Sequence, residues 1–226
     1  ADLAALPFQP DYVPARSRFF QSRPRLGETY ITQAYLKLIA DAREEALIAN
    51  AYFLPSPELI EAVKDAARRC VRVIILTNSP ETNDLPDLTI VGRGYYMDIL
   101  SVNQEPAVKN CECEDPGVQI WEWQGRRAGE TERSQGTIHA KYAVFDRLVS
   151  LVGSHNLDPR SDKLNSESAI VFESRELSDQ LAGLFYVNDM VFSKQISVDE
   201  AKEFKTPSDT FYRLRKGFGG LFEEHL

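Results

Sequence analysis

Two kinds of hydrophobic pattern follow one another along the chain. Short apolar runs are typical of buried strands, and longer stretches with an apolar residue at every third or fourth position are typical of amphipathic helices. The short runs predict strands at Ala46 to Phe53, Val71 to Thr77, Val118 to Gln124, Ile138 to Phe145, Leu148 to Val152 and Ser168 to Phe172. The longer pattern predicts helices at Glu28 to Arg43, Pro57 to Arg69, Gly94 to Val102 and Arg175 to Phe192. This alternation predicts an α/β fold, with a mixed sheet flanked by helices.

Polar residues beside these segments give further local signals. Ser56 is a preferred N-cap residue, and Pro57 suits the first helical position because its missing N–H would have no intrahelical partner. The run Thr77-Asn78-Ser79 follows a buried strand, at the edge where α/β sheets usually bind ligands. We therefore expect these polar side chains near the mouth of a substrate site. The stretch Asn103 to Pro116 is predicted to be a loop.

One segment carries the candidate chemistry. Residues two apart in a strand point to the same face, so His139 and Lys141 are expected side by side. A turn at Asp146-Arg147 would return the next apolar run as a neighbouring strand. That strand would bring Ser154 and Asn156 to the same end of the sheet as the histidine and the lysine.

These residue types suit attack on a phosphodiester. An imidazole has a reference pKa of about 6.5, so His139 can act as a neutral nucleophile and form a covalent phosphohistidine. Lys141 supplies a positive charge, and the Asn156 amide and Ser154 hydroxyl can donate hydrogen bonds to the nonbridging oxygens, without a metal. Gly153 would let the backbone approach the phosphate. Lys141, Ser154 and Asn156 are thus the expected phosphate-binding residues.

The order of these residues, H-x-K-x4-D-x6-G-S-x-N, resembles the HKD signature of the phospholipase D superfamily. The run Asn165-Ser166-Glu167 follows where that family places an acidic partner for its histidine. The resemblance implies an α-β-α sandwich, a phosphohistidine intermediate and no metal or other cofactor. It also implies that Glu167 accepts a proton from the second imidazole nitrogen of His139 and supports the cationic intermediate. Asp146 is assigned to a supporting ion pair or turn, and His155 to a structural role facing away from the site.

The sequence contains three histidines, and only His139 lies in the motif. Cleavage also needs a general acid for the departing oxygen, which superfamily members obtain from a second HKD histidine. That histidine can come from a homodimer partner, as in small one-motif nucleases, or from the other half of a two-motif protein. The stretch YFLPSPELIEAVKDAARRCVRVIILTNS and the run Asn156 to Ser161 resemble the second half of bacterial cardiolipin synthase-like proteins, which favours an excised C-terminal half. Residues 1–27 are then expected to be a linker or extended lead, before a catalytic domain at 28–226.

Charge bears on the choice of substrate. A net charge of −8 and a sequence pI near 5.0 argue against an indiscriminate nucleic-acid binder, which would usually have a basic surface. The leading interpretation is a phosphatidyltransferase that acts on a phospholipid. The alternatives are a homodimeric one-motif phosphodiesterase or nuclease, and a non-catalytic binding scaffold. A scaffold would be free to lose the motif residues, and all of them are present.

The remaining features concern location and the cysteines. Neither an apolar run of about 18 residues nor a secretion signal is present, so we expect a cytoplasmic chain or peripheral contact with the inner membrane face. The C-terminal stretch DTFYRLRKGFGGLFEEHL mixes aromatic and basic residues and could rest on lipid, although packing onto the domain is favoured. The three cysteines predict no disulfide framework, and the Cys111-Glu112-Cys113 loop lacks a second ligand pair for a metal.

Overall fold

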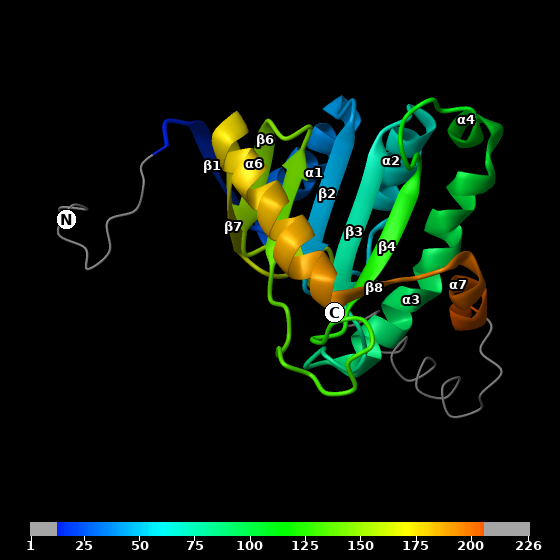
Figure 1. Ribbon diagram of the computed structural model, residues 1–226. Helices are drawn as coiled ribbons and strands as arrows, with labels where there is room; N and C mark the ends of the chain where they lie inside the picture. Colours follow the sequence, from blue (N-terminus) through cyan, green and yellow to red (C-terminus); the bar gives the residue numbers. More distant parts are fainter. Residues whose placement is uncertain (1–12, 206–226) are drawn as a thin grey trace.

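A mixed sheet of eight strands lies between two layers of helices (Figure 1). The computed structural model describes residues 13–205. The strand order is β1-β7-β6-β5-β2-β3-β4-β8. The strands are β1 (Arg16–Ser22), β2 (Glu45–Asn50), β3 (Arg72–Asn78), β4 (Val118–Trp123), β5 (Lys141–Phe145), β6 (Val149–Gly153), β7 (Glu167–Glu173) and β8 (Ser193–Gln195). The α-helices are α1 (Tyr30–Asp41), α2 (Pro57–Arg68), α3 (Pro86–Ser101), α4 (Pro106–Lys109), α5 (Pro159–Lys163), α6 (Arg175–Leu184) and α7 (Val198–Lys205).

The parallel strands β2, β3 and β4 form one half of the sheet, and the other pairings are antiparallel. Every residue of β2 is buried, as expected for a strand that is covered on both faces. Strand β5 pairs with β2 in a register that sets Lys141 opposite Asn50. The start of β5 therefore lies at the carboxyl ends of β2 and β3, and this register fixes the position of the motif.

Each face of the sheet has its own hydrophobic core. Helices α1, α2, α3 and α7 cover one face, where Ile48, Ile75 and Ile120 are buried against them. Helix α6 and the turn after it cover the other face, where Leu47 and Leu76 lie in the same cluster as Ala182 and Phe185. Side chains alternate between the two faces along β2 and β3, so each of these strands contributes side chains to both cores.

Most predicted elements are present, and the predicted α/β fold is confirmed. Helix α2 begins at Pro57, and the Ser56 hydroxyl accepts the Leu59 backbone N–H at 3.3 Å, as an N-cap should. Strands β3, β4, β6 and β7 lie close to their predicted bounds. Local propensity and burial pattern therefore agree over most of the sheet.

Several predicted bounds were wrong. Helix α3 begins at Pro86 rather than Gly94 and contains Gly92. A side chain at Gly92 would collide with the Phe53 carbonyl oxygen, so only glycine lets the helix approach there. The expected loop after Val102 contains a 3-10 turn and α4. The helix predicted from Arg175 ends at Leu184 and continues as π and 3-10 turns over Phe185–Asp189 and Met190–Phe192.

Some elements gave no usable sequence signal. Residues Arg16–Ser22, within the expected lead, form the edge strand β1, which pairs with β7 along its whole length. Its first six side chains in succession are exposed or half-buried, leaving no apolar alternation to detect. Strand β8 and helices α5 and α7 are short or strongly polar, and they also escaped prediction.

The structure joins Cys70 to Cys111 in a disulfide, which corrects the expectation that the cysteines form none. The two Cα atoms are 5.5 Å apart, within the usual range for a disulfide. Cys113 is a free, exposed thiol whose Sγ lies 3.4 Å from the Cys70 carbonyl oxygen. A count of cysteines could not reveal this pairing, because it depends on the end of α2 meeting the turn after α4.

Two expectations concern the ends of the described region. The C-terminal aromatic and basic stretch, with His225, lies outside residues 13–205. Within that range, no helix combines the length and apolar character needed to cross a membrane.

Candidate active site

The β5–β6 hairpin positions both ends of the motif. Asp146 and Arg147 form its turn with φ values of 52° and 49°, the positive values that a two-residue type I′ turn requires. The Asp146 carboxylate accepts the backbone N–H groups of Arg43, Glu44 and Glu45 at 2.8 to 3.2 Å. Asp146 thus joins the hairpin to the α1–β2 loop, at the opposite end of the strands from the catalytic candidates.

His139 and Lys141 meet around one aromatic ring. His139 is exposed just before β5, and its ring stands edge-on to Tyr52 with centroids 6.3 Å apart. The Lys141 ammonium lies 5.9 Å from the Tyr52 ring centroid and donates to the His139 carbonyl oxygen at 3.3 Å. The nucleophile candidate is therefore accessible to solvent and has a cation beside it.

Glu167 is the centre of a polar network at the start of β7. It is 7 % exposed. Its Oε2 accepts from the Ser154 hydroxyl, and its Oε1 accepts from Ser161 Oγ at 3.1 Å and Asn165 Nδ2 at 3.2 Å. Ser161 Oγ in turn accepts the Asn156 backbone N–H at 3.1 Å. The network ties the loop after β6 to β7.

Two expected contacts are not made in this structure. In the described part of the chain the His139 ring has no hydrogen bond to Glu167, whose oxygens accept from the serines and Asn165 instead. Ser154 donates its one hydroxyl hydrogen to Glu167 and accepts the Ser168 N–H at 3.0 Å, so that hydrogen is not free for a phosphate. Lys141 and the Asn156 amide are the remaining donors of the predicted set.

Several carboxylates surround the cation. Burial lowers the pKa of Lys141 below its ordinary value, and the charges of Glu167, Asp158 and Asp84 offset only part of that shift. Burial also raises the pKa of Asp158, which caps α5 by accepting the Ser161 N–H at 2.8 Å. These carboxylates therefore favour the charged form of Lys141 and oppose the effect of its partial burial.

The other residues of the motif have structural surroundings. His155 is 1 % exposed, and its Nε2 lies 3.3 Å from Asp162 Oδ1, away from the exposed face on which His139 lies. Gly153 is required by β7, because a side chain there would collide with the Ser168 carbonyl oxygen. The expected approach to a phosphate is therefore not what restricts this position to glycine.

Sequence reasoning missed Tyr52 and Asp84, and it misjudged the run Thr77-Asn78-Ser79. The Tyr52 hydroxyl donates to Asp84, and burial, with that hydrogen bond, raises the Tyr52 pKa. The run was expected at the substrate mouth, but its three side chains are at most 3 % exposed. Neither tyrosine nor aspartate forms a recognisable spacing with the motif, so only the folded arrangement reveals them.

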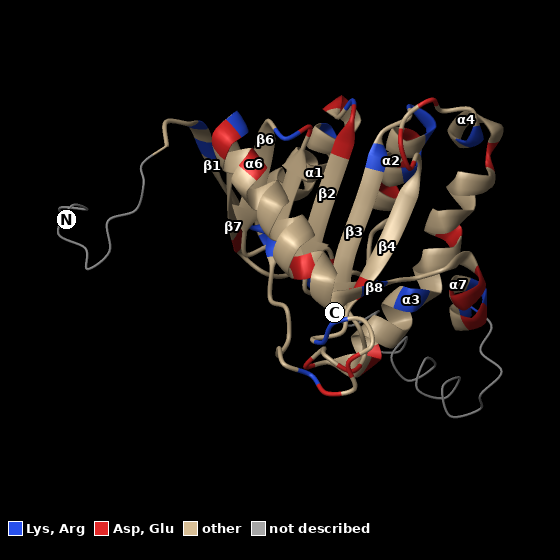
Figure 2. Cartoon of the chain, in the orientation of Figure 1, with Lys and Arg blue, Asp and Glu red and all other residues tan. Residues whose placement is uncertain are grey.

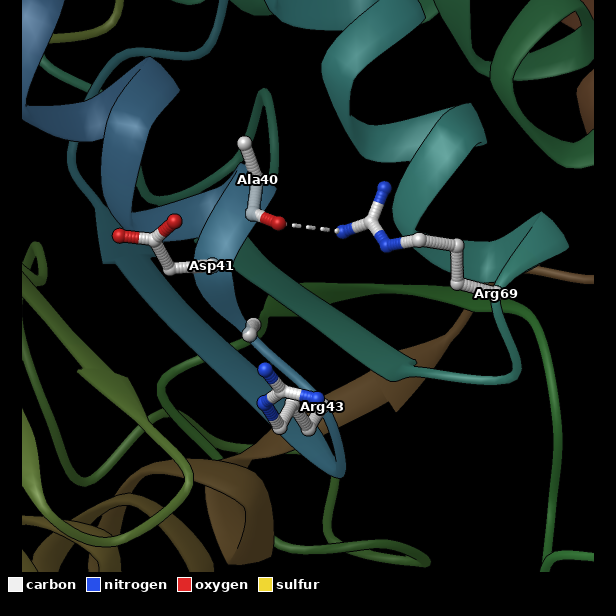
Figure 3. A pocket seen from close by; sticks show the side chains of 5 residues that line it. Ala40, Asp41, Arg43 and Arg69 are labelled. Atoms are coloured by element: carbon white, nitrogen blue, oxygen red, sulfur yellow. Dashed lines mark hydrogen bonds between the residues drawn. The ribbon is translucent and has the colours of Figure 1, made fainter.

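The surface hollows lie away from this cluster. One of about 570 Å³ is lined by Ala40, Asp41, Ala42, Arg43 and Arg69, and Arg69 donates to the Ala40 carbonyl oxygen there (Figure 3). Another of about 230 Å³ includes Asp146. Both are at the end of β2 opposite the His139 cluster. Among residues 13–205, no group of three or more His, Cys, Asp or Glu side chains could hold a metal ion.

Comparison with known proteins decides the family. The family model described as "Cardiolipin synthase, PLD-like domain" matches residues 35–187, which include the HKD motif and Glu167. The chain belongs to the phospholipase D superfamily. The phospholipase D signature seen in the sequence is thereby confirmed as a family relationship.

Curated relatives of this phospholipase D-like domain are bacterial cardiolipin synthases. The chain is 30% identical to cardiolipin synthase B of Escherichia coli K12 over 187 residues, covering 82% of this chain and 38% of the relative. It is 32% identical to cardiolipin synthase B of Salmonella typhi over 191 residues, with the same coverage. The chain thus spans well under half the length of these relatives.

Solved structures share the phospholipase D fold. Phosphatidylserine synthase of Haemophilus influenzae has a TM-score of 0.69 at 15% identity, with 92% of this chain and 46% of that chain covered. Nuc of Salmonella typhimurium, a phospholipase D family member, has a TM-score of 0.57 at 15% identity, with 80% of this chain and 99% of that chain covered. At this identity the likeness confirms the α-β-α fold.

Proposed function

We propose that this domain carries one half of a phosphatidyl-transfer site of the cardiolipin synthase type. The observation that carries the proposal is an exposed His139 beside Lys141, at the end of a sheet whose loops hold Asn156 and Glu167 in one network. The similarity to cardiolipin synthases supports a phospholipid as the substrate. A binding scaffold would not need a reactive imidazole at this place.

The proposed reaction has two displacements. An imidazole nitrogen of His139 forms a bond to phosphorus, and the bond from phosphorus to the departing oxygen breaks while a general acid protonates that oxygen. An acceptor hydroxyl, or water, then gives its proton to the general acid that the first step left deprotonated, and attacks the phosphohistidine, which breaks the phosphorus–nitrogen bond. The first step releases an alcohol, and the second gives a new phosphodiester or a phosphate monoester.

Lys141 and Asn156 meet the charge that collects on the nonbridging oxygens. Lys141 is held beside His139, and nearby carboxylates favour its charged form against the effect of burial. The Asn156 backbone N–H donates to Ser161 Oγ, and within residues 13–205 its side-chain Nδ2 donates to no other group, so this donor is left for a phosphate oxygen. Ser154 acts indirectly, because it binds Glu167. Donors placed in advance of reaction stabilise the transition state without reorganisation.

Charge favours a lipid over a nucleic acid. Glu167, Asp158 and Asp84 all act on the one site lysine. A phosphatidyl group presents a single phosphodiester, whereas nucleic acid presents a run of phosphates that these carboxylates would repel. Figure 2 shows acidic and basic positions together at both ends of the sheet. The homodimeric phosphodiesterase remains the alternative that the substrate test must address.

The proposal includes partners. A second HKD histidine, from another half or a second copy, supplies the general acid for the departing oxygen. A phospholipid substrate also requires contact with a membrane surface, so we propose peripheral attachment on the inner membrane face.

The test is an assay of the complete protein on phosphatidylglycerol vesicles with excess EDTA. We expect cardiolipin formation at the rate of the untreated protein, since Lys141 and Asn156 do the work that a metal would otherwise do. The protein should convert phosphatidylglycerol to cardiolipin and should not cleave duplex DNA. Loss of activity in chelator that a divalent ion restores would contradict the mechanism, and faster cleavage of DNA would favour the nuclease.

Glu167→Gln is expected to lower kcat on the order of 10²-fold, with a smaller change in KM. Glutamine removes the charge that supports Lys141 and breaks the acceptor network, a loss comparable to that of one oxyanion donor. Without that charge the Lys141 pKa falls further. Since Lys141 must be protonated, activity should decline at a lower pH in the variant than in the unmodified protein. Kinetics over a range of pH check both effects.

The matched control is Glu173→Gln, at the far end of the same strand. Glu173 is exposed and pairs only with Arg16 among described residues, at 3.3 Å. Its replacement should leave kcat and the pH profile unchanged. Equal losses for the two variants would mean that the Glu167 effect comes from damage to β7.

A further inference from the structure

Asn78, at the end of β3, is fully buried and makes several hydrogen bonds with the segment that carries His139. Its Nδ2 donates to the Ile138 carbonyl oxygen at 2.8 Å, and its Oδ1 accepts the Ile138 N–H at 3.1 Å. The same Nδ2 also donates to the Ala51 carbonyl oxygen at 2.9 Å. One side-chain amide therefore holds both backbone polar groups of the residue next to His139.

The segment needs this support because it lies just outside the sheet, where Ile138 has no neighbouring strand within residues 13–205 to bind its backbone. Strand β5 begins at Lys141, although the apolar run predicted a strand from Ile138. The Ala51 N–H still donates to the Ala140 carbonyl oxygen at 2.9 Å. His139 thus lies between two anchored residues, Ile138 held by a side chain and Ala140 held by backbone.

We propose that Asn78 is a positioning residue for His139, acting through the Ile138 backbone. The inference rests on the proposed role of His139 as nucleophile. An amide is suited to this position because it is both donor and acceptor, so it can replace a neighbouring strand at one residue. The Asn78 Oδ1 also accepts from Thr82 Oγ1 at 3.2 Å, and Thr82 O accepts from the Thr137 hydroxyl, which extends the support to the residue before Ile138.

The chain contains a matched control. Asn103 Nδ2 donates to the Val118 carbonyl oxygen at 2.8 Å, and its Oδ1 accepts the Val118 N–H at 2.8 Å. This is the same pairing of one amide with one residue, at the start of β4 and thus at the other end of the sheet. Replacing Asn103 removes equivalent hydrogen bonds without touching the His139 segment.

The experiment compares Asn78→Ala, Asn78→Asp and Asn103→Ala in the complete protein. We expect Asn78→Ala to lower kcat by about 10²-fold, the cost of displacing a reacting group by about 1 Å, with KM little changed because the phosphate donors remain. Asn78→Asp keeps the acceptor for the Ile138 N–H but loses the donor. Its kcat should therefore lie between those of Asn78→Ala and the unmodified protein. Asn103→Ala should retain its kcat per folded molecule.

Hydrogen exchange of the peptide spanning 137–141 gives a readout that does not depend on activity. The Ile138 amide should exchange faster in Asn78→Ala than in the unmodified protein or in Asn103→Ala. Unchanged exchange, unchanged kcat, or equal losses of kcat in the two alanine variants would overturn the inference, as would failure of both Asn78 variants to fold. An inactive unmodified protein would instead count against the proposed function, while the exchange data would still test whether Asn78 holds the Ile138 backbone.

Discussion

Replacement of His139 by alanine is expected to abolish turnover, with a fall in kcat on the order of 10⁴-fold or more, as for loss of a catalytic nucleophile. No phosphohistidine can form without this imidazole, and no other histidine in the described range is exposed. Because His139 is itself exposed, its loss should change stability by less than about 0.5 kcal/mol. Kinetics on phosphatidylglycerol, together with trapping of the labelled phosphoenzyme, measure the effect.

His155→Ala is the matched variant. His155 lies close to Asn156 in the chain but is buried beside Asp162 and Tyr35, with ring centroids of His155 and Tyr35 6.1 Å apart. We expect this variant to keep most of its kcat per folded molecule while losing about 0.5 to 3 kcal/mol of unfolding free energy, as buried substitutions commonly do. Equal loss of kcat in the two variants would overturn the assignment of His139.

The local part of this site was predictable from sequence. Strand alternation predicted His139 and Lys141 close together, and they are, although His139 lies before β5 rather than in it. The Asp146-Arg147 turn was identified from the apolar runs on either side of it. Both inferences depend only on neighbours in the chain. The burial of His155 agrees with the structural role that its place beside the motif suggested.

The contacts made across the fold were not predictable in the same way. Glu167 was expected to bind His139, but Ser161 and Ser154 occupy it instead, because α5 brings Ser161 to the start of β7. Asn78 looked like a ligand residue because it ends a parallel strand. It is buried because the His139 segment crosses over it, an arrangement that depends on how far β5 extends.

The same limit explains the lead segment and the cysteines. Strand β1 is held to β7 through backbone pairing at an exposed edge, which leaves little trace in side-chain pattern. The Cys70–Cys111 bond joins positions 41 residues apart in the chain. In both cases the deciding contact lies between distant segments, and no periodicity within either one encodes it.

A sample of this chain that is monomeric and has no second HKD partner is expected to turn over about 10² to 10⁴-fold more slowly than the complete site, the usual contribution of general acid catalysis. The departing oxygen needs a proton, and the described groups around His139 do not supply one readily. The Tyr52 hydroxyl donates to Asp84, and Asp158 accepts the Ser161 N–H. An imidazolium from another HKD motif is the natural donor, since its pKa lies near neutrality.

Light scattering and phosphodiesterase assays on the same sample test this requirement. If the second histidine belongs to another half of a longer protein, adding that half should restore the rate without self-association of this chain. If it belongs to a second copy, activity per molecule should rise with concentration as dimers form, and the one-motif homodimer would become the better description. A stable monomer with the full rate would refute the two-histidine mechanism, because a single exposed imidazole would then serve as nucleophile while some other group protonates the departing oxygen.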